Sequence, residues 1–284
     1  MKNWYRSGSS LIHDLSALCP PQSAVSIWHI GQCGIILKYG QAVLFVDPVL
    51  TPITDAAGIS RKHLEAPFRP EDPFDVNAVF CTHNHLDHLN PDTVRGIASA
   101  HPQTRFFIPA GVLEETADLF AGFSDRVVPL RQRDTVPVAD GICVTAVAAA
   151  HDQYRADANG NEKALGYLFR CGPLNLFHAG DTLATPRLVS ELRALGPIHA
   201  AFLPINGRDW ARESDGIIGN MNPQEAALFA EQIRCDTVFP THYDMMIGNE
   251  VNPLIFAQYM ADRYPYRPFH FLQPGEPFLF WRSE

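Results

Sequence analysis

The sequence lacks any run of about 18 consecutive apolar residues, the length that a membrane-spanning helix needs. Its first 18 residues place charged side chains within an amphipathic pattern, whereas a secretory signal needs an uninterrupted apolar segment. These absences argue against a membrane span and a signal peptide. We therefore expect a cytoplasmic protein without a membrane partner.

Clustered cysteines are absent as well. The six cysteines are dispersed, no two of them form a Cys-x-x-Cys pair, and most lie in segments predicted as strands. This distribution favours reduced core residues over a disulfide framework. The six are Cys19, Cys33, Cys81, Cys143, Cys171 and Cys235.

Positive charge is scarce. The chain has 22 lysines and arginines against 31 acidic residues, a net charge of -9, and no basic cluster. Nucleic-acid binding needs a basic stripe, so we expect no nucleic-acid partner. The Gly-x-Ser-x-Gly elbow, the Walker loop and the dinucleotide fingerprint are also missing, which argues against a serine nucleophile, ATP and NAD.

What the sequence does contain is a dense group of metal-ligand side chains. Residues 82–88 read Thr-His-Asn-His-Leu-Asp-His and follow an apolar run typical of a strand. In an extended chain His83 and His85 project to the same side, so both can bind one ion. Asp87 and His88 follow where the chain must turn, and dividing the four ligands between two ions leaves open positions on both. A chance cluster is the less probable alternative, because only 12 of the 284 residues are histidine.

Hydrophobic patterning predicts two similar halves in which strands alternate with helices. This order favours an α/β fold with two sheets face to face and helices outside. With 46% hydrophobic residues the chain can bury a large core, and we expect one domain over residues 1–284. The irregular, proline-rich section 51–73 is expected to be an inserted loop or lid.

The predicted strands are 25–30, 34–39, 42–46, 78–81, 104–108, 142–148, 165–170, 174–177, 200–204, 237–240, 270–272 and 278–281. The predicted helices are 91–100, 110–120, 186–195, 223–233, with Asn222 as N-cap, and 253–264.

The His-x-His-x-Asp-His pattern at a strand end resembles the signature of the metallo-β-lactamase superfamily, whose members are mostly hydrolases with an αββα four-layer sandwich. The resemblance extends over nearly the whole chain. It includes Trp-His-Ile-Gly-Gln-Cys-Gly-Ile at 28–35 with Asp-Pro at 47–48, Leu-Gly-Tyr-Leu-Phe at 165–169, His-Ala-Gly-Asp at 178–181, and Pro-Thr-His-Tyr-Asp at 240–244. Within the superfamily these motifs are most similar to the L-ascorbate-6-phosphate lactonase group.

The resemblance implies the remaining ligands of a dinuclear centre. By position His151 matches the third histidine of the first metal, and Asp181 the carboxylate that bridges the two ions. His242 would complete the second site beside Asp87 and His88. For these three residues the alternatives are a loop histidine, a helix N-cap and a structural histidine.

Other residues are expected next to the ligands. Asp47 is expected to accept a hydrogen bond from a ligand imidazole, and Thr82 and Thr241 to bond to the ligands that follow them. His178 has two open interpretations, a partner that orients Asp181 or a plain core histidine. Core packing is the preferred interpretation of Cys33.

Two divalent ions about 3.5 to 4 Å apart would lower the pKa of a shared water and present hydroxide to a carbonyl or phosphoryl centre. In this mechanism Asp87 orients the hydroxide or carries its proton. The histidine-rich ligand set favours Zn²⁺, while the resemblance to the lactonases also allows Mn²⁺.

Candidate substrate residues lie near these motifs. Arg208 and Arg212 are expected either to hold a phosphate or carboxylate or to pair with acidic residues of their own loop. Tyr154, Arg155 and Tyr243 follow the ligands His151 and His242 and are further candidates for substrate contact.

The sequence therefore predicts a metal-dependent hydrolase of a small-molecule substrate, a small lactone of the L-ascorbate 6-phosphate type, with or without a phosphate group. A phosphodiesterase or another ester hydrolase on the same site is the alternative. A metal-binding sensor without activity is the third hypothesis, and the full ligand set disfavours it. The sequence does not fix the oligomeric state, and a homo-oligomer is compatible with it.

Overall fold

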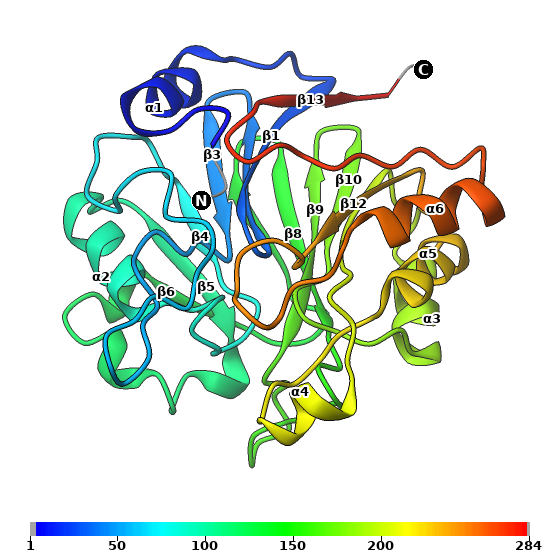
Figure 1. Ribbon diagram of the computed structural model, residues 1–284. Coiled ribbons are helices and arrows are strands. Elements are labelled where there is room, and N and C mark those ends of the chain that lie inside the picture. The colour runs from blue at the N-terminus through cyan, green and yellow to red at the C-terminus, as the bar shows by residue number, and fades with distance from the viewer. Residues whose placement is uncertain (1–3, 283–284) are drawn as a thin grey trace.

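Two β-sheets lie face to face, with helices on the outer side of each (Figure 1). The computed structural model describes residues 4–282. The first sheet has the strand order β13-β1-β2-β3-β4-β5-β6. Its strands are β1 (Ala24–Gly31), β2 (Gly34–Tyr39), β3 (Ala42–Val46), β4 (Ala78–Phe80), β5 (Arg105–Pro109), β6 (Val127–Leu130) and β13 (Phe278–Trp281).

The second sheet has the order β12-β11-β10-β9-β8-β7. Its outermost strand β12 pairs in parallel with β11, and β11 with β10, whereas β7 to β10 form an antiparallel meander. The strands are β7 (Thr135–Ala139), β8 (Ile142–Ala148), β9 (Leu165–Cys171), β10 (Leu174–His178), β11 (Ala200–Pro204) and β12 (Thr237–Thr241).

Six helices accompany the sheets within the described residues. Three of them, α3, α5 and α6, lie beside the second sheet on the yellow-green to orange side of Figure 1. The helices are α1 (Gly8–Ala17), α2 (Pro91–Ala100), α3 (Pro186–Ala194), α4 (Trp210–Ser214), α5 (Pro223–Gln232) and α6 (Leu254–Arg263). Asn222 caps α5 as predicted, because its side chain accepts from Glu225 N while the Glu225 carboxylate accepts from Asn222 N.

Three buried clusters establish the layer order. Between the sheets, Ile27 of β1 and Leu37 of β2 share a cluster with Phe169 of β9. Behind the first sheet, Trp28 packs in a cluster with Ile97 of α2. A third cluster joins the second sheet to α3, α5 and α6. Neighbouring residues such as Ile27 and Trp28 enter different clusters, because successive side chains of a strand point to opposite faces of the sheet. The four-layer αββα fold predicted from the sequence is confirmed.

Most predicted elements are present, but one predicted helix and one predicted strand are not. The helix predicted over 110–120 is wrong, because the segment forms two short 3-10 turns, Ala110–Val112 and Ala117–Leu119. Gly111 lies so close to another loop that an added Cβ would be 2.4 Å from Asn161 O. The strand predicted over 270–272 is also wrong. An isolated bridge, Val238 to Phe269, forms beside this segment instead. Pro268 and Pro274 flank the segment, and neither has an N–H to donate to a neighbouring strand. Strands β6 and β7 and helices α1 and α4 were not predicted.

The proline-rich section 51–73 lies between the parallel neighbours β3 and β4 and contains no helix or strand. Its backbone bonds to the loop after β12: His63 N donates to Met245 O, and Ile247 N donates to Arg61 O. These hydrogen bonds hold the section across the edge of the sheets at which β4, β8, β10 and β12 end. None of the helices between residues 4 and 282 has the length and apolar character that a bilayer crossing would need.

Candidate metal centre

The predicted ligands converge because their strands end at the same edge of the two sheets. His83, His85, Asp87 and His88 follow β4, His151 follows β8, Asp181 follows β10 and His242 follows β12. Backbone hydrogen bonds join these loops, since Leu165 N donates to Thr82 O and Leu183 N donates to Ala150 O. His83 and His242, 159 positions apart in the sequence, come together at this edge.

A first group consists of His83, His85 and His151, each of which places a ring nitrogen within 4.8 Å of the other two. His151 Nε2 lies 3.2 Å from His85 Nδ1. His83 Nε2 is buried and has no hydrogen-bond partner among the described residues. Burial, followed by the neighbouring histidines, holds the pKa of His83 well below its usual value and also lowers the pKa of His85. Three imidazoles gathered in this way suit a cation, which would satisfy the orphaned nitrogen of His83.

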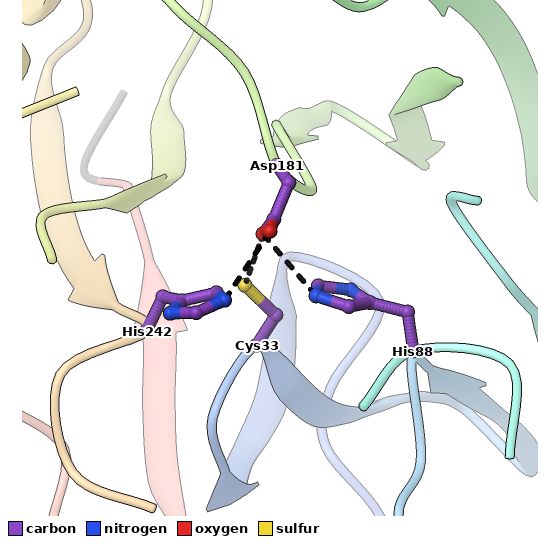
Figure 2. Close-up of side chains that lie close together, drawn as sticks. All are labelled: Cys33, His88, Asp181 and His242. Carbon is purple, nitrogen blue, oxygen red and sulfur yellow. Dashed lines mark hydrogen bonds and ion pairs between the residues drawn. The ribbon is translucent and has the colours of Figure 1, made fainter. Parts of the chain in front are cut away.

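A second group consists of Cys33, His88, Asp181 and His242, all buried and all with a ligand atom within 4.8 Å of one another. Figure 2 shows the Asp181 carboxylate facing the ring nitrogens of His88 and His242, with the Cys33 sulfur between the two rings. Asp181 Oδ1 lies 3.2 Å from His88 Nε2 and 3.7 Å from Cys33 Sγ.

Asp181 also connects the two groups. Its Oδ2 lies 3.2 Å from His242 Nε2 in the second group and 3.4 Å from His151 Nε2 in the first. A carboxylate between two sets of imidazoles has the placement that a bridging ligand requires. Asp181 is presented by the Ala179-Gly180 turn, where Gly180 has a φ of +58°.

Asp87 lies at the open side of the second group. Its Oδ2 is 3.5 Å from His242 Nε2 and 3.7 Å from His88 Nε2. The same oxygen accepts a hydrogen bond of 2.7 Å from the Gln32 amide. Burial acts to raise the pKa of Asp87, but His88 and His242 outweigh it, so the carboxyl is held well below its usual pKa.

The electrostatics of the second group require positive charge. Burial acts to lower the pKa of His88, yet the carboxylates of Asp181, Asp47 and Asp87 outweigh it and raise that pKa well above its usual value. For His242 the same balance, led among the raising causes by Asp181, gives a pKa of about 9. Without a metal, protons on these two imidazoles neutralise the buried carboxylates. A divalent cation would replace those protons, so the donor set fits a metal ion.

The predicted hydrogen bond to a ligand imidazole is present at Asp47. Its Oδ2 lies 2.7 Å from His88 Nδ1, and both side chains are fully buried. Thr82 donates to the same carboxylate from its backbone N and from Oγ1, both at 2.8 Å. Because the Asp47 carboxylate accepts at Nδ1, His88 carries a proton on Nδ1, and its Nε2 is directed at the second group. Asp47 itself has a φ of +47°, an uncommon conformation at a position fixed from three sides.

Comparison with known proteins agrees with this geometry. The family model described as the beta-lactamase superfamily domain matches residues 43–243, which is more than half of the chain. The chain belongs to the metallo-β-lactamase superfamily. The UPF0173 metal-dependent hydrolase of Pyrococcus horikoshii is 25% identical over 254 residues, which cover 89% of this chain and 98% of that protein. This chain is a metal-dependent hydrolase, and the comparisons show no lactonase specificity.

Two further relatives bear on fold and substrate. The structure of Igni18, a metallo hydrolase from the archaeon Ignicoccus hospitalis, matches with a TM-score of 0.69 at 19% identity and covers 92% of this chain and all of that one. That likeness concerns the fold alone. The N-acyl-phosphatidylethanolamine-hydrolyzing phospholipase D 1 of Caenorhabditis elegans is 24% identical over 226 residues, covering 75% of this chain and 62% of the relative.

The sequence did not point to the supporting role of Gln32, which lies at the tip of the β1-β2 hairpin of this hydrolase. Its amide nitrogen lies 2.7 Å from Asp87 Oδ2 and 3.0 Å from His242 Nε2. Gln32 N donates to Asp244 Oδ1, and His29 Nε2 lies 2.8 Å from Asp244 Oδ2. Gln32 and His242 both have positive φ values, +57° and +59°. Two neighbouring residues with uncommon backbone conformations therefore mark this site in the structure.

Cys33 lies closer to the candidate site than core packing alone requires, and His178 is a core histidine, the second of its two interpretations. Cys33 Sγ belongs to the second group and not only to the core. His178 makes no hydrogen bond to the Asp181 carboxylate among the described residues. Its Nε2 donates to Cys33 O at 2.8 Å, and its Nδ1 accepts from Gly180 N at 3.2 Å. His178 therefore holds the backbone beside both residues, not the carboxylate itself. Thr241 Oγ1 contacts Cys33 Sγ at 3.7 Å.

A cavity of about 260 Å³ opens over Asp181, His151, His85 and Asp87 in this hydrolase. Arg208 and Arg212 do not line it. The Arg208 guanidinium makes two hydrogen bonds of 2.7 Å to the Glu225 carboxylate. Arg212 Nε lies 2.5 Å from Asp209, and its Nη1 bonds to Asn206 O. Arg212 thus pairs with an acidic residue of its own loop, as the second of the two interpretations had it, whereas the partner of Arg208 lies on α5. Arg208 instead lines a separate cavity on the other side of residues 216–218.

The three other substrate candidates also lie outside this cavity. Tyr154 bonds to Thr185 Oγ1 at 2.7 Å, under the Arg187 guanidinium. Arg155 pairs with Asp152 three residues earlier. Tyr243 stacks on His29, and burial raises its pKa. These residues follow ligands in the sequence, but they do not line the cavity, because each side chain contacts another partner.

Proposed function

We propose that this hydrolase holds two divalent metal ions in neighbouring positions. His83, His85 and His151 would hold the first, and Asp87, His88 and His242 the second, with Asp181 shared between them. The observation that carries the proposal is the position of the Asp181 Oδ2 atom, 3.4 Å from His151 Nε2 and 3.2 Å from His242 Nε2. With a single ion, one of the two ligand groups would have no cation.

Zinc is the ion that the donors favour. All donors of the first group are imidazole nitrogens, and the second group has two imidazoles and the soft Cys33 thiol, whereas Mn²⁺ prefers a larger share of oxygen ligands. We propose Zn²⁺ as the resident ion and Mn²⁺ as the weaker alternative.

When bound, two such ions polarise the substrate oxygen and lower the pKa of water toward neutrality. The residues of the chain supply the rest. Asp87 lines the cavity while its Oδ2 is held by Gln32 at 2.7 Å, so this carboxylate can orient a water and take up its proton. Asp47 keeps the His88 proton on Nδ1, and His178 holds the backbone that presents Asp181.

We propose a small anionic lactone as the substrate class, and L-ascorbate 6-phosphate, which the sequence resemblance suggests, as the first compound to test. The cavity over the two groups, about 260 Å³, is below the range of about 300–1,000 Å³ typical of drug-sized ligands, and this size favours a small molecule. The chain would then act as one domain over residues 1–284, with section 51–73 as the lid of this cavity, a role that its bonds to the loop after β12 support.

A second candidate is hydrolysis of a phosphodiester. It is favoured by the likeness to the nematode protein, whose name describes a phospholipase D. The same ligand set serves a phosphoryl centre equally well, since two ions can contact both the attacking and the leaving oxygen.

The test is the rate at which metal-quantified protein opens L-ascorbate 6-phosphate, with bis(p-nitrophenyl) phosphate as the competing substrate. His85→Ala removes a first-group ligand, and His13→Ala changes an exposed histidine on α1 as a matched control. Lactone opening that His85→Ala abolishes and His13→Ala keeps would support the lactonase. Diester cleavage alone would move the proposal to the second candidate. Two bound ions with neither activity would overturn both substrate classes.

A further inference from the structure

The cavity above the two ligand groups has a polar floor, formed by the predicted ligands, and apolar side chains along the rest of its wall. Its apolar lining includes two side chains that are unusually exposed for their type, Leu86 at 56% and Ile247 at 45%. Exposed aliphatic side chains around a concave site are a mark of ligand binding. The apolar lining consists of Ile53, Leu86, Ile217, Ile218, Met246 and Ile247.

Arg61 is the only arginine that lines this cavity within residues 4–282. Its backbone is fixed on both sides, because its N donates to Ile53 O at 2.8 Å and its O accepts from Ile247 N at 2.9 Å. Both partners are themselves lining residues, so the side chain starts from a defined point on the wall. Section 51–73 carries this arginine to the cavity.

The Arg61 guanidinium differs from the other arginines near the site in having no ion pair or hydrogen bond among the described residues. Arg208 is paired with Glu225 and Arg212 with Asp209, and Arg155 is paired with Asp152. The Arg61 side chain is exposed, so water satisfies its N–H groups, and these can exchange that water for an oxyanion that enters the cavity.

We propose that Arg61 binds an oxyanion of the substrate, a carboxylate or a phosphate, and that an aliphatic segment of the same molecule packs on the apolar lining. The proposal rests on the proposed function, because it places the scissile bond of this substrate at the two ligand groups. The substrate class is then a lactone or ester that joins a short alkyl portion to an anionic end.

The walls argue against a polyhydroxylated substrate. Hydroxyl groups in a site need hydrogen-bond partners, and burying them without partners is costly. Away from the ligand groups and Arg61, Asn249 is the only lining side chain with a polar group, and its Oδ1 already accepts from Asn206 Nδ2 and Arg212 Nη1. An alkyl lactone with an anionic arm therefore fits this lining better than a sugar lactone does.

The test uses a matched trio of γ-butyrolactones whose alkyl arm, of fixed length, ends in a methyl group, a carboxylate or a phosphate. Metal-loaded wild type, Arg61→Gln and Arg61→Lys are compared, with Arg155→Gln as control, since Arg155 is an exposed arginine that does not line the cavity. We expect Arg61→Gln to reduce kcat/KM for the anionic lactones by about 10- to 100-fold, while the neutral lactone changes less than about twofold. Arg61→Lys should recover part of the loss, and the carboxylate and phosphate arms identify the preferred anion.

Equilibrium binding of hexanoate to the same metal-loaded proteins gives a readout that does not depend on turnover. We expect weaker binding to Arg61→Gln than to wild type or Arg155→Gln. Hydrolysis of all three lactones with an anion preference that Arg61→Gln leaves unchanged would overturn the role of Arg61 and keep the proposed function. No hydrolysis of any lactone, together with hexanoate binding that depends on Arg61, would overturn the lactonase and keep the anion site.

Discussion

His88 Nδ1 lies 2.7 Å from Asp47 Oδ2, and neither side chain has any exposed surface. The carboxylate is a pure acceptor, so it fixes the imidazole proton on Nδ1 and leaves Nε2 for the second ligand group. Asp47 stands 41 residues before His88 and follows the neighbouring strand β3, so the sheet itself sets their distance.

We expect Asp47→Asn to weaken metal binding by about 10- to 100-fold while the protein stays folded. The asparagine oxygen can still accept from Thr82 N, but its NH₂ group cannot accept from His88. Competition with a chromophoric chelator measures the affinity, and metal analysis gives the stoichiometry. Asp14→Asn, which changes a buried aspartate on α1, is the control and should bind metal normally. Equal affinity in wild type and Asp47→Asn would contradict this role.

The turn before Asp181 gives a second prediction. Gly180 has a φ of +58°, and an added Cβ would lie 2.6 Å from Thr82 Cβ. We expect Gly180→Ala to lower the free energy of unfolding by about 3 kcal/mol, because it combines left-handed strain with a steric clash. Displacement of Asp181 should also reduce the bound metal.

Gly40→Ala is the matched control for this variant, since Gly40 has a φ of +56° and open space around its Cα. It should show the backbone strain alone, about 1 to 2 kcal/mol. Urea unfolding of the metal-free proteins measures both values. Equal losses in the two variants would mean that the contact with Thr82 is easily relieved.

The fold was predictable where hydrophobic patterns are local. Strands such as Gly34–Tyr39 and Ile142–Ala148 follow directly from apolar runs between turns. Residues 110–120 have the composition of a helix, but the contact of Gly111 with the loop at Asn161 is a tertiary effect that no local pattern carries. Edge strand β6 was missed because Val127–Leu130 is short and holds a proline.

The ligand groups were predictable because each ligand ends a recognisable strand. Their supports were not, since they join distant segments. His29 and Asp244 are 215 residues apart, and Gln32 reaches Asp87 across 55. Arg208 was proposed for the cavity from its place in the chain, yet Glu225 of α5 takes its guanidinium. Which arginine stays unpaired depends on every acidic residue that the fold brings near.

The position of Cys33 gives a third prediction, on the second group. We expect the Co²⁺-loaded protein to show near-ultraviolet charge-transfer absorption from a thiolate bound to cobalt, because the sulfur lies within 4.8 Å of the ligand atoms of His88, Asp181 and His242. Cys33→Ala should lose the band. Cys81→Ala, which removes a buried cysteine outside the group, should keep it. Full cobalt occupancy without the band in wild type would show that Cys33 packs against the site and does not bind the ion.

Lys62 gives the last prediction, on pH and stability. It follows Arg61 in section 51–73, and its ammonium lies 3.1 Å from Thr51 O, with the side chain almost fully buried. Burial lowers its pKa from 10.5 to about 8. Between these pH values the unfolded chain binds more protons than the folded one, so the free energy of unfolding rises with pH in this window. Below pH 8 the full cost of burying the charged form is present, roughly 3 kcal/mol.

Comparison with Lys62→Met isolates this effect, because the variant keeps the aliphatic stem and removes the charge. The difference in unfolding free energy, wild type minus Lys62→Met, should shift in favour of wild type by roughly 3 kcal/mol as the pH rises from about 8 to 10.5. Urea titrations across this range measure it, and other titrating groups cancel in the difference. A flat difference for Lys62→Met would mean that the carbonyl partners of its ammonium compensate the burial completely.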